Sequence, residues 1–211
     1  MPKVVITGFG IFSGVSKNPT EDIIHSLEDW CLDGCDISKA TLVCSVEHLD
    51  EFLEDLNKNE IRKSTSVDIL LVHLGVDCGS TSMKLETTAY NNMTFRVPDQ
   101  SGFTPEFAKI SDIAAFESPL ESCVNIPSLC DELKSDQWNV EVSSDPGRYL
   151  CNYIYYKSLQ LTKKKQEAFG TACCQSIFIH VPKIDVIPLD KQVAFVKKAV
   201  EIMLQMIALK A

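Results

Sequence analysis

Residues 67–75 read VDILLVHLG, and this nearly unbroken apolar run decides the fold class. A strand that is buried on one face alternates apolar and polar residues. A run that is apolar throughout is typical of a central strand covered by helices on both faces. We therefore expect residues 67–75 to form a central strand of a mostly parallel sheet.

The segments on either side of this strand alternate between strand and helix patterns. Strands are expected over residues 4–8, 41–46, 138–142 and 177–181; helices are expected from Asn18-Pro19 and over residues 48–59, 127–136, 150–161 and 189–209. This alternation predicts a single α/β domain over residues 1–211, with helices on both faces of the sheet. Residues 98–126 show no clear period, and loops of this length tend to be functional covers or mobile.

The composition is ordinary for a soluble globular protein, with 45% hydrophobic and 23% charged residues. The formal net charge of −9 opposes binding to a phosphate backbone, so no nucleic-acid partner is expected. The densest basic cluster, Lys163 to Lys165, is interpreted as a solvated helix end. No segment reaches the apolar length of a membrane span, so no membrane partner is expected.

Nine cysteines are the unusual feature of the composition. The N-terminal sequence MPKVVITGFG has no cleavable signal pattern, so we expect a cytoplasmic protein with reduced thiols. The chain lacks a CxxC pair: Cys31 and Cys35 are too far apart, and Cys173 and Cys174 are adjacent. This spacing does not fit a structural zinc site, so we expect no metal and no other cofactor.

Cys151 and His180 are the pair with the strongest functional pattern. Asp145-Pro146-Gly147 predicts a sharp turn, which places Cys151 in the first turn of a helix. The free N–H groups and the positive end of such a helix are expected to lower the thiol pKa and to bind an oxyanion. His180 lies near the end of the strand SIFIHVP, where an imidazole can act as the base for a thiol nucleophile.

Each of these residues also has a purely structural interpretation. Most cysteines in a reduced protein are small core residues, and a lone histidine in a strand can be a core residue too. His73, near the end of the central strand, is the main competing base. Glu86 would orient an imidazole as the third member of a triad, although a surface charge on a strand is the alternative.

The loop TGFGIFSG, residues 7–14, allows two interpretations. Its glycines resemble a dinucleotide-binding fingerprint, but the next helix begins only near Asn18-Pro19, several residues after the loop. Phe9 and Phe12 stand where a phosphate-binding loop needs bare backbone. We interpret the loop as the wall of a small apolar pocket, with a tight turn carrying two core phenylalanines as the alternative.

Six segments resemble the pyroglutamyl-peptidase I (pyrrolidone-carboxylate peptidase) family, in the order found in that family. They are VVITGFGIF followed by NPT, LLVHLGV, KLETTAYN, FRVPDQSG, DPGRYLCNYIYYKSL and FIHVP. The resemblance implies a three-layer α/β/α sandwich of the phosphorylase/hydrolase-like kind, with a mostly parallel, mixed and twisted sheet. It also implies a cysteine exopeptidase that removes N-terminal pyroglutamyl residues from peptides through a thioester.

The resemblance assigns roles to seven residues. It implies Cys151 as nucleophile, His180 as base and acid, and Glu86 as the orienting carboxylate. It further implies a substrate pocket lined by aromatic residues, with an arginine near the scissile bond. The residues at these positions are Phe9, Phe12, Tyr149 and Arg96.

The chain departs from the family pattern at three places. Thr87 stands where the family commonly has a basic residue, and Phe12 is followed by Ser13-Gly14. Twenty-eight residues separate Cys151 from His180. These departures leave open a catalytically silent relative that binds pyroglutamyl peptides, and the glycine loop leaves open a nucleotide- or nucleoside-handling enzyme. The oligomeric state also stays open.

Overall fold

The computed structural model describes residues 1–12, 17–63, 69–169 and 174–208. The strands among them are Lys3–Phe9 (β1), Asp36–Leu42 (β2), Ile69–Val76 (β3), Met83–Glu86 (β4), Thr88–Tyr90 (β5), Pro119–Glu121 (β6), Val140–Ser143 (β7) and Cys174–Val181 (β8). The helices are Pro19–Ser26 (α1), Val46–Leu56 (α2), Ile126–Ser135 (α3), Leu150–Phe169 (α4) and Leu189–Ala208 (α5), with a π-helical turn η1 over Asn57–Ile61.

The central sheet has six strands in the order β2-β1-β3-β8-β4-β7. Every neighbouring pair is parallel except β4 and β8, which run antiparallel, so the sheet is mostly parallel and mixed as predicted. β3 and β8 lie at its centre, and nearly all of their residues are buried. The described part of the apolar run, from Ile69 onward, therefore forms a central strand.

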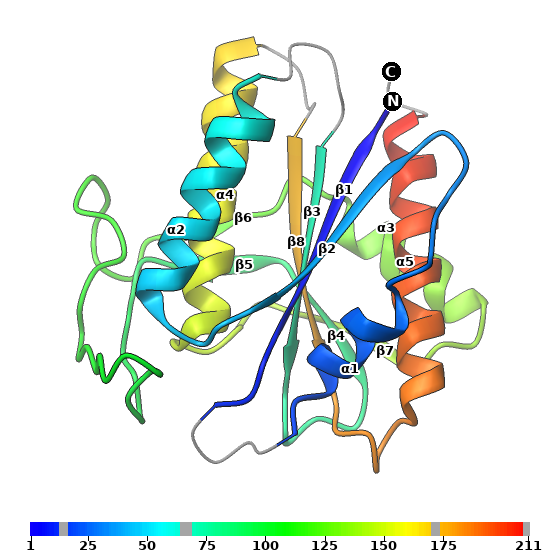
Figure 1. Ribbon diagram of the computed structural model, residues 1–211, viewed down its shortest axis with the longest axis horizontal. Helices are drawn as coiled ribbons and strands as arrows, with labels where there is room; N and C mark the ends of the chain where they lie inside the picture. Colours follow the sequence, from blue (N-terminus) through cyan, green and yellow to red (C-terminus); the bar gives the residue numbers. More distant parts are fainter. Residues whose placement is uncertain (13–16, 64–68, 170–173, 209–211) are drawn as a thin grey trace.

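Helices cover both faces of this sheet (Figure 1). On one face, α2 and α4 enclose a core that includes Leu71, Tyr155 and Phe178. On the other face, α1, α3 and α5 enclose a second core that includes Leu70, Ile179 and Phe195. Alternate residues of β3 and β8 thus enter different cores, which is the reason that both strands are apolar throughout.

The sequence pattern placed strand β2 wrongly, at residues 41–46 rather than Asp36–Leu42. The chain leaves the sheet after Leu42 because Ser45 caps α2, its side chain accepting a hydrogen bond from the His48 N–H at 3.3 Å. β2 lies at the edge of the sheet and is only partly buried, so its sequence lacks a clear alternating pattern.

Helix α4 is longer than expected and continues to Phe169. The interpretation of Lys163 to Lys165 as a solvated helix end is wrong for Lys165, which is buried and donates from Nζ to the Ile61 carbonyl at 2.7 Å. The long aliphatic stem of a lysine can pack in a core while its ammonium group finds a carbonyl partner. Residues 170–173, which include Cys173, lie outside the described residues.

The segment over residues 98–126 is irregular, as predicted, apart from β6 and the first residue of α3. Its first part lies on the α2 and α4 side of the sheet, and its end crosses to α3 on the other side, where Val124 and Ile126 join the second core (Figure 1). Asp99 anchors its start, because the Asp99 carboxylate accepts hydrogen bonds from the N–H groups of Val46, Ser101 and Phe103, each at 2.9 Å. A segment without regular structure is thus tied to the N-terminus of α2.

Candidate active site

Cys151 lies in the first turn of α4, as the turn signal before it predicted. Gly147 has φ of 78°, a conformation that favours glycine, and its N–H donates to the Asp145 carboxylate at 3.1 Å. The Tyr153 N–H then donates to the Tyr149 carbonyl at 3.0 Å, which closes the first helical turn around Cys151. The first N–H groups of a helix have no carbonyl partner within it, which leaves those at the start of this turn available to an anion.

A small apolar pocket lies against Cys151. Its lining includes Phe9, Phe12 and Tyr149, together with Cys44, and its free volume is about 30 Å³. The rings of Phe12 and Tyr149 lie 6.1 Å apart. The three aromatic residues that the sequence assigned to a pocket therefore lie together beside the proposed nucleophile. Ser13 and Gly14, which follow Phe12, lie outside the described residues.

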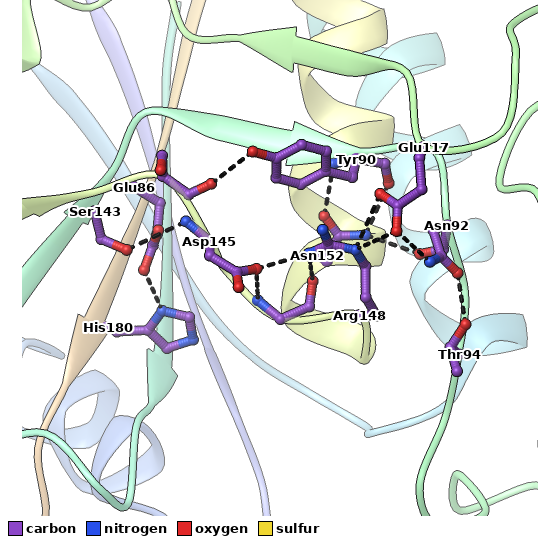
Figure 2. Close-up of polar contacts among 12 residues, drawn as sticks. Glu86, Tyr90, Asn92, Thr94, Glu117, Ser143, Asp145, Arg148, Asn152 and His180 are labelled. Atoms are coloured by element: carbon purple, nitrogen blue, oxygen red, sulfur yellow. Dashed lines mark hydrogen bonds and ion pairs between the residues drawn. The ribbon is translucent and has the colours of Figure 1, made fainter. Parts of the chain in front are cut away.

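Glu86 and His180 form a buried pair. Glu86 Oε1 lies 2.8 Å from His180 Nδ1, and Figure 2 shows this contact. The side chain of Glu86 is fully buried, while that of His180 retains 9% of its surface exposed. The alternative interpretation of Glu86 as a surface charge is wrong. β4 places Glu86 next to β8, where its strand partner in the antiparallel pairing is Phe178.

Gly75 connects this pair to Cys151. In the parallel register of β3 and β8, Gly75 is the partner of His180, so both positions face the same side of the sheet. A Cβ atom built on Gly75 would lie 2.9 Å from Cys151 Sγ and 2.6 Å from the Phe178 ring. The thiol therefore occupies the space that a side chain at position 75 would need. The sheet brings Cys151, His180 and Glu86 to one place from three distant segments.

The predicted lowering of the Cys151 pKa is not what the structure shows. Burial raises the pKa of the Cys151 thiol above its ordinary value, and the nearby Cys44, Glu86 and Asp77 act in the same direction. The N–H of Cys151 itself opposes the rise. Enclosure of the sulfur outweighs the helix N-terminus in the free protein, because removing water disfavours the thiolate. Among the described residues, Cys151 forms no hydrogen bond to His180.

His73, the competing base, is part of the core. It is fully buried, and its Nδ1 lies 2.8 Å from the Thr7 hydroxyl. Burial lowers the pKa of His73 to about 3, so the ring is neutral at physiological pH. Within the described part of the chain no carboxylate bonds to it, and its Nε2 has no hydrogen-bond partner. It therefore lacks the anion that an imidazolium needs.

Asn152 holds the backbone beside the nucleophile, a function that the sequence argument missed. Its side chain is fully buried: Oδ1 accepts from the Tyr90 N–H at 2.8 Å, and Nδ2 donates to the carbonyls of Tyr90 and Asn92 at 2.8 and 2.9 Å. The Asn152 amide thus makes the hydrogen bonds to residues 90–92 that a neighbouring strand would otherwise make. An Asn in the apolar first turn of a helix, directly after the candidate Cys, was the available signal.

Arg148 connects the turn before Cys151 to the irregular segment. Its Nε lies 3.1 Å from Glu117 Oε1 and its Nη1 lies 2.7 Å from Asp145 Oδ1, while the guanidinium is 4.1 Å from the centre of the Tyr90 ring. Glu117 also accepts from Asn92 Nδ2 at 2.7 Å. Figure 2 shows these residues as one network next to the α4 N-terminus. No local pattern marks Arg148 and Glu117 as partners.

A larger cleft, with a free volume of about 640 Å³, opens next to the small pocket. Phe12 and Tyr149 line both, so the two spaces share a wall. Arg96 is exposed and lines the larger cleft rather than the small pocket. In the described residues it forms no ion pair, and it does not contact Cys151. The structure thus brings six of the seven assigned residues together and places Arg96 farther out.

Three further observations concern the cysteines, the helices and the loop after β1. Free thiols are found at Cys31, Cys35, Cys44, Cys78, Cys123, Cys130 and Cys151, and the described residues contain no cluster of three or more metal-binding side chains. None of the described helices is long and apolar enough to cross a membrane. Asn18 Nδ2 and Cys44 Sγ both donate to the Gly10 carbonyl in the loop after β1, so this loop surrounds an apolar pocket instead of presenting its backbone to a phosphate.

Comparison with known proteins gives a consistent result. The chain is 30% identical over 188 residues to the pyrrolidone-carboxylate peptidase of Thermococcus litoralis, covering 86% of this chain and 77% of the relative. It is 29% identical to that of Pyrococcus furiosus, covering 90% and 85%.

Solved structures agree with these relatives. The pyrrolidone carboxyl peptidase of Thermococcus litoralis superposes with a TM-score of 0.85 at 25% identity, covering 100% of this chain and 97% of that one. The enzyme of Fervidobacterium islandicum AW-1 gives 0.81 at 26% identity, covering 95% and 97%. The family model described as pyroglutamyl peptidase matches residues 2–209. The chain therefore belongs to the pyroglutamyl peptidase family, whose members are cysteine peptidases.

Proposed function

We propose that this protein hydrolyses the bond after an N-terminal pyroglutamyl residue, with Cys151 as nucleophile. The observation that carries the proposal is the placement of Cys151 between an apolar pocket and Gly75, the strand partner of a His180 that is bonded to buried Glu86. A thiol, an imidazole and a carboxylate in this order are the parts of a cysteine hydrolase.

The raised thiol pKa determines the first step of the mechanism. Since burial keeps the thiol protonated, His180 must remove its proton as the sulfur attacks the scissile carbonyl. The developing oxyanion is stabilised by N–H groups of the first α4 turn. His180 then donates the proton to the departing amine, which leaves a thioester on Cys151. Water, deprotonated by His180, attacks the thioester and releases pyroglutamate.

Glu86 stabilises the imidazolium that exists during these steps. Its Oε1 is bonded to His180 Nδ1, while Oε2 is buried without a hydrogen-bond partner in the described residues. A buried carboxylate with an unpartnered oxygen is costly, and a neighbouring positive charge offsets that cost. A positively charged His180 ring therefore interacts more favourably with Glu86 than a neutral ring does. This difference favours proton transfer from the thiol to His180.

The small pocket supports selection of the pyroglutamyl ring. This lactam is neutral and flat, and it has no charged amine for an acidic anchor to bind. Aromatic walls from Phe9, Phe12 and Tyr149 suit such a ring, whereas a charged N-terminus would lose its hydration there. The free pocket has room for only a few water molecules, so Phe12, which is half-buried at its edge, must turn aside when the ring enters.

The proposal is tested by replacing the nucleophile. We expect Cys151→Ala to reduce hydrolysis of a pyroglutamyl fluorogenic amide by about a thousandfold or more. Cys78→Ala, which removes an exposed thiol, is the matched control and should retain normal activity. A glutaminyl amide should not be cleaved by the wild-type protein. Near-normal turnover by Cys151→Ala would refute the proposal.

One observation favours a second function, the binding of pyroglutamyl peptides without hydrolysis. Among the described residues Cys151 forms no hydrogen bond to His180, and burial raises the pKa of the thiol, so both features favour a thiol that stays protonated in the free protein. The alkylation rate of Cys151, measured by mass spectrometry against those of the other thiols, separates the two functions. An active site should alkylate at Cys151 faster than at exposed Cys31 or Cys78, and His180→Ala should abolish that difference.

A further inference from the structure

A large cleft leads away from the small pocket, and we propose that it binds the peptide that follows the pyroglutamyl residue, preferring a large apolar side chain directly after it. This inference rests on the proposed function, because it takes the position of the scissile bond at Cys151. It adds the part of the substrate that leaves, and it assigns Phe107 as a residue that determines specificity.

The position of the cleft decides which part of the substrate it receives. The small pocket and the larger cleft share Phe12 and Tyr149, and Cys151 lines the small pocket. With the pyroglutamyl ring in the small pocket, the scissile carbonyl lies at Cys151 and the leaving amine points past the two shared aromatic residues. The next residues of the peptide therefore enter the larger cleft, whose room of about 640 Å³ suits several residues.

Phe107 is the most unusual residue in that cleft. It has φ of 47°, which is rare and strained for a bulky side chain, and 67% of its surface is exposed. Its N–H donates to the Thr94 hydroxyl at 3.2 Å, which fixes the backbone in this conformation. In the free protein the strain is not balanced by burial of the ring. An apolar side chain from the substrate would cover Phe107 and remove it from water.

A second strained residue shows that the cleft wall is fixed. Glu117, which also lines the cleft, has φ of 60° and is held by Arg148 and Asn92. Because the network pairs Arg148 with Glu117 and Asp145, the charges on this wall are compensated. The cleft therefore does not select strongly for one sign of charge through these residues. Arg96, which also lines the cleft, would attract a carboxylate, whereas apolar contact with Phe107 and half-exposed Val97 is the basis for selecting an apolar side chain.

The test compares two peptides that differ only at the residue after pyroglutamate. Pyroglutamyl-phenylalanyl amide and pyroglutamyl-glycyl amide both lack a terminal carboxylate, so Arg96 does not distinguish them. We expect the wild-type protein to prefer the phenylalanyl peptide about tenfold in kcat/KM. Phe107→Ala should reduce this ratio to within about twofold. Ile113→Ala, which removes an apolar side chain with 89% exposure that does not line the cleft, should leave the ratio unchanged.

Binding measurements separate this inference from the proposed function. Calorimetry with Cys151→Ala protein repeats the peptide comparison without turnover, and the phenylalanyl peptide should bind about tenfold more tightly unless Phe107 is also replaced. If the wild-type protein cleaves neither peptide, the proposed function fails, while this difference in binding would still support the site. A wild-type ratio near one, or a ratio that Phe107→Ala leaves unchanged, would overturn the inference.

Discussion

His73 and His180 lie on adjacent central strands and face the same side of the same sheet, yet they are suited to opposite tasks. The Phe178 ring contacts both, with centroids 6.5 Å from His73 and 4.7 Å from His180. His73 pairs with a hydroxyl and is fully enclosed, whereas His180 pairs with a carboxylate at the end of its strand. His180 is the strand partner of Gly75, so a shift of only two residues along the paired strands separates the core imidazole of His73 from the proposed catalytic base.

The difference teaches that position along the strand and the partner of the ring determine the function of a histidine here. At the carboxyl ends of parallel strands the sheet opens toward ligands, and Gly75 leaves room there for the thiol. At the position of His73 no such opening remains, because the ring is fully buried beside Phe178 and Thr7. The same residue type therefore has a buried neutral state in one place and a charge-compensated site in the other.

The largest expected effect comes from replacing the two histidines in turn. We expect His180→Ala to reduce kcat/KM for a pyroglutamyl amide by about a thousandfold, because no base remains to remove the thiol proton. His73→Ala should instead lower the free energy of unfolding by about 2 kcal/mol, while the folded protein keeps most of its activity. Activity assays and urea unfolding measure both. An inactive His73 variant alongside an active His180 variant would reverse the comparison.

Removing the charge from the partner of His180 is the next test. Glu86→Gln keeps a side chain that can accept a hydrogen bond from Nδ1 but does not stabilise an imidazolium. We expect kcat to fall by about a hundredfold or more. Glu121→Gln, in an exposed carboxylate on β6, is the control and should retain wild-type kinetics. Equal activity of the two variants would show that the carboxylate does not distinguish His180 from His73.

The space at Gly75 gives a smaller effect. Gly75→Ala puts a methyl group within 3 Å of Cys151 Sγ and the Phe178 ring, so one of them must shift. We expect kcat/KM to fall about tenfold and the free energy of unfolding to fall by about 1–3 kcal/mol. At Gly79 a new Cβ would lie 3.6 Å from its nearest neighbour, Asp77 Oδ1, so Gly79→Ala should change neither. Normal kinetics for Gly75→Ala would mean that the thiol does not depend on this contact.

The pH dependence of stability tests the neutral state of His73. Burial lowers its pKa from 6.5 to about 3 in the folded protein, so between these values the unfolded chain binds a proton that the folded chain does not. The free energy of unfolding therefore falls as the pH falls below 6.5, by up to about 1.4 kcal/mol per pH unit from this group. Above pH 6.5 the group has no effect.

A variant isolates this contribution from that of the carboxylates. His73→Asn removes the titrating group while keeping a polar side chain toward Thr7. In urea titrations between pH 7.5 and 5, its stability should depend less steeply on pH than that of the wild-type protein. Parallel curves for the two proteins would show that His73 is not held neutral by burial.

Much of the fold could be predicted because its central elements have strong patterns. The apolar run of β3, the turn before α4 and the strand β8 each stood out locally, so Cys151 and His180 could be proposed together. β4 did not stand out, because it has four residues and its direction depends on pairing with β8. Glu86 could therefore be identified only through the family resemblance.

Other features of the site depend on contacts between distant segments. The sequence indicated a helix N-terminus at Cys151 but not the enclosure of its sulfur, and this is why the expected direction of the pKa shift was wrong. Asn152 and Arg148 act on residues 90–92 and 117, which are far away in the chain. Local periodicity contains no information about such pairs. Arg96 was assigned from its motif alone, and the fold places it on the outer cleft.

The place of β8 in the sheet has a consequence for the order of synthesis. β8 lies between β3 and β4, yet it begins only at Cys174, so a growing chain completes β2-β1-β3 and β4-β7 as separate pieces before the strand that joins them is made. Until then each piece has an open edge, and the chain lacks the imidazole of residue 180. A nascent chain that has not yet reached Cys174 therefore exposes two unpaired strand edges, at which it can associate, and it lacks the proposed catalytic base.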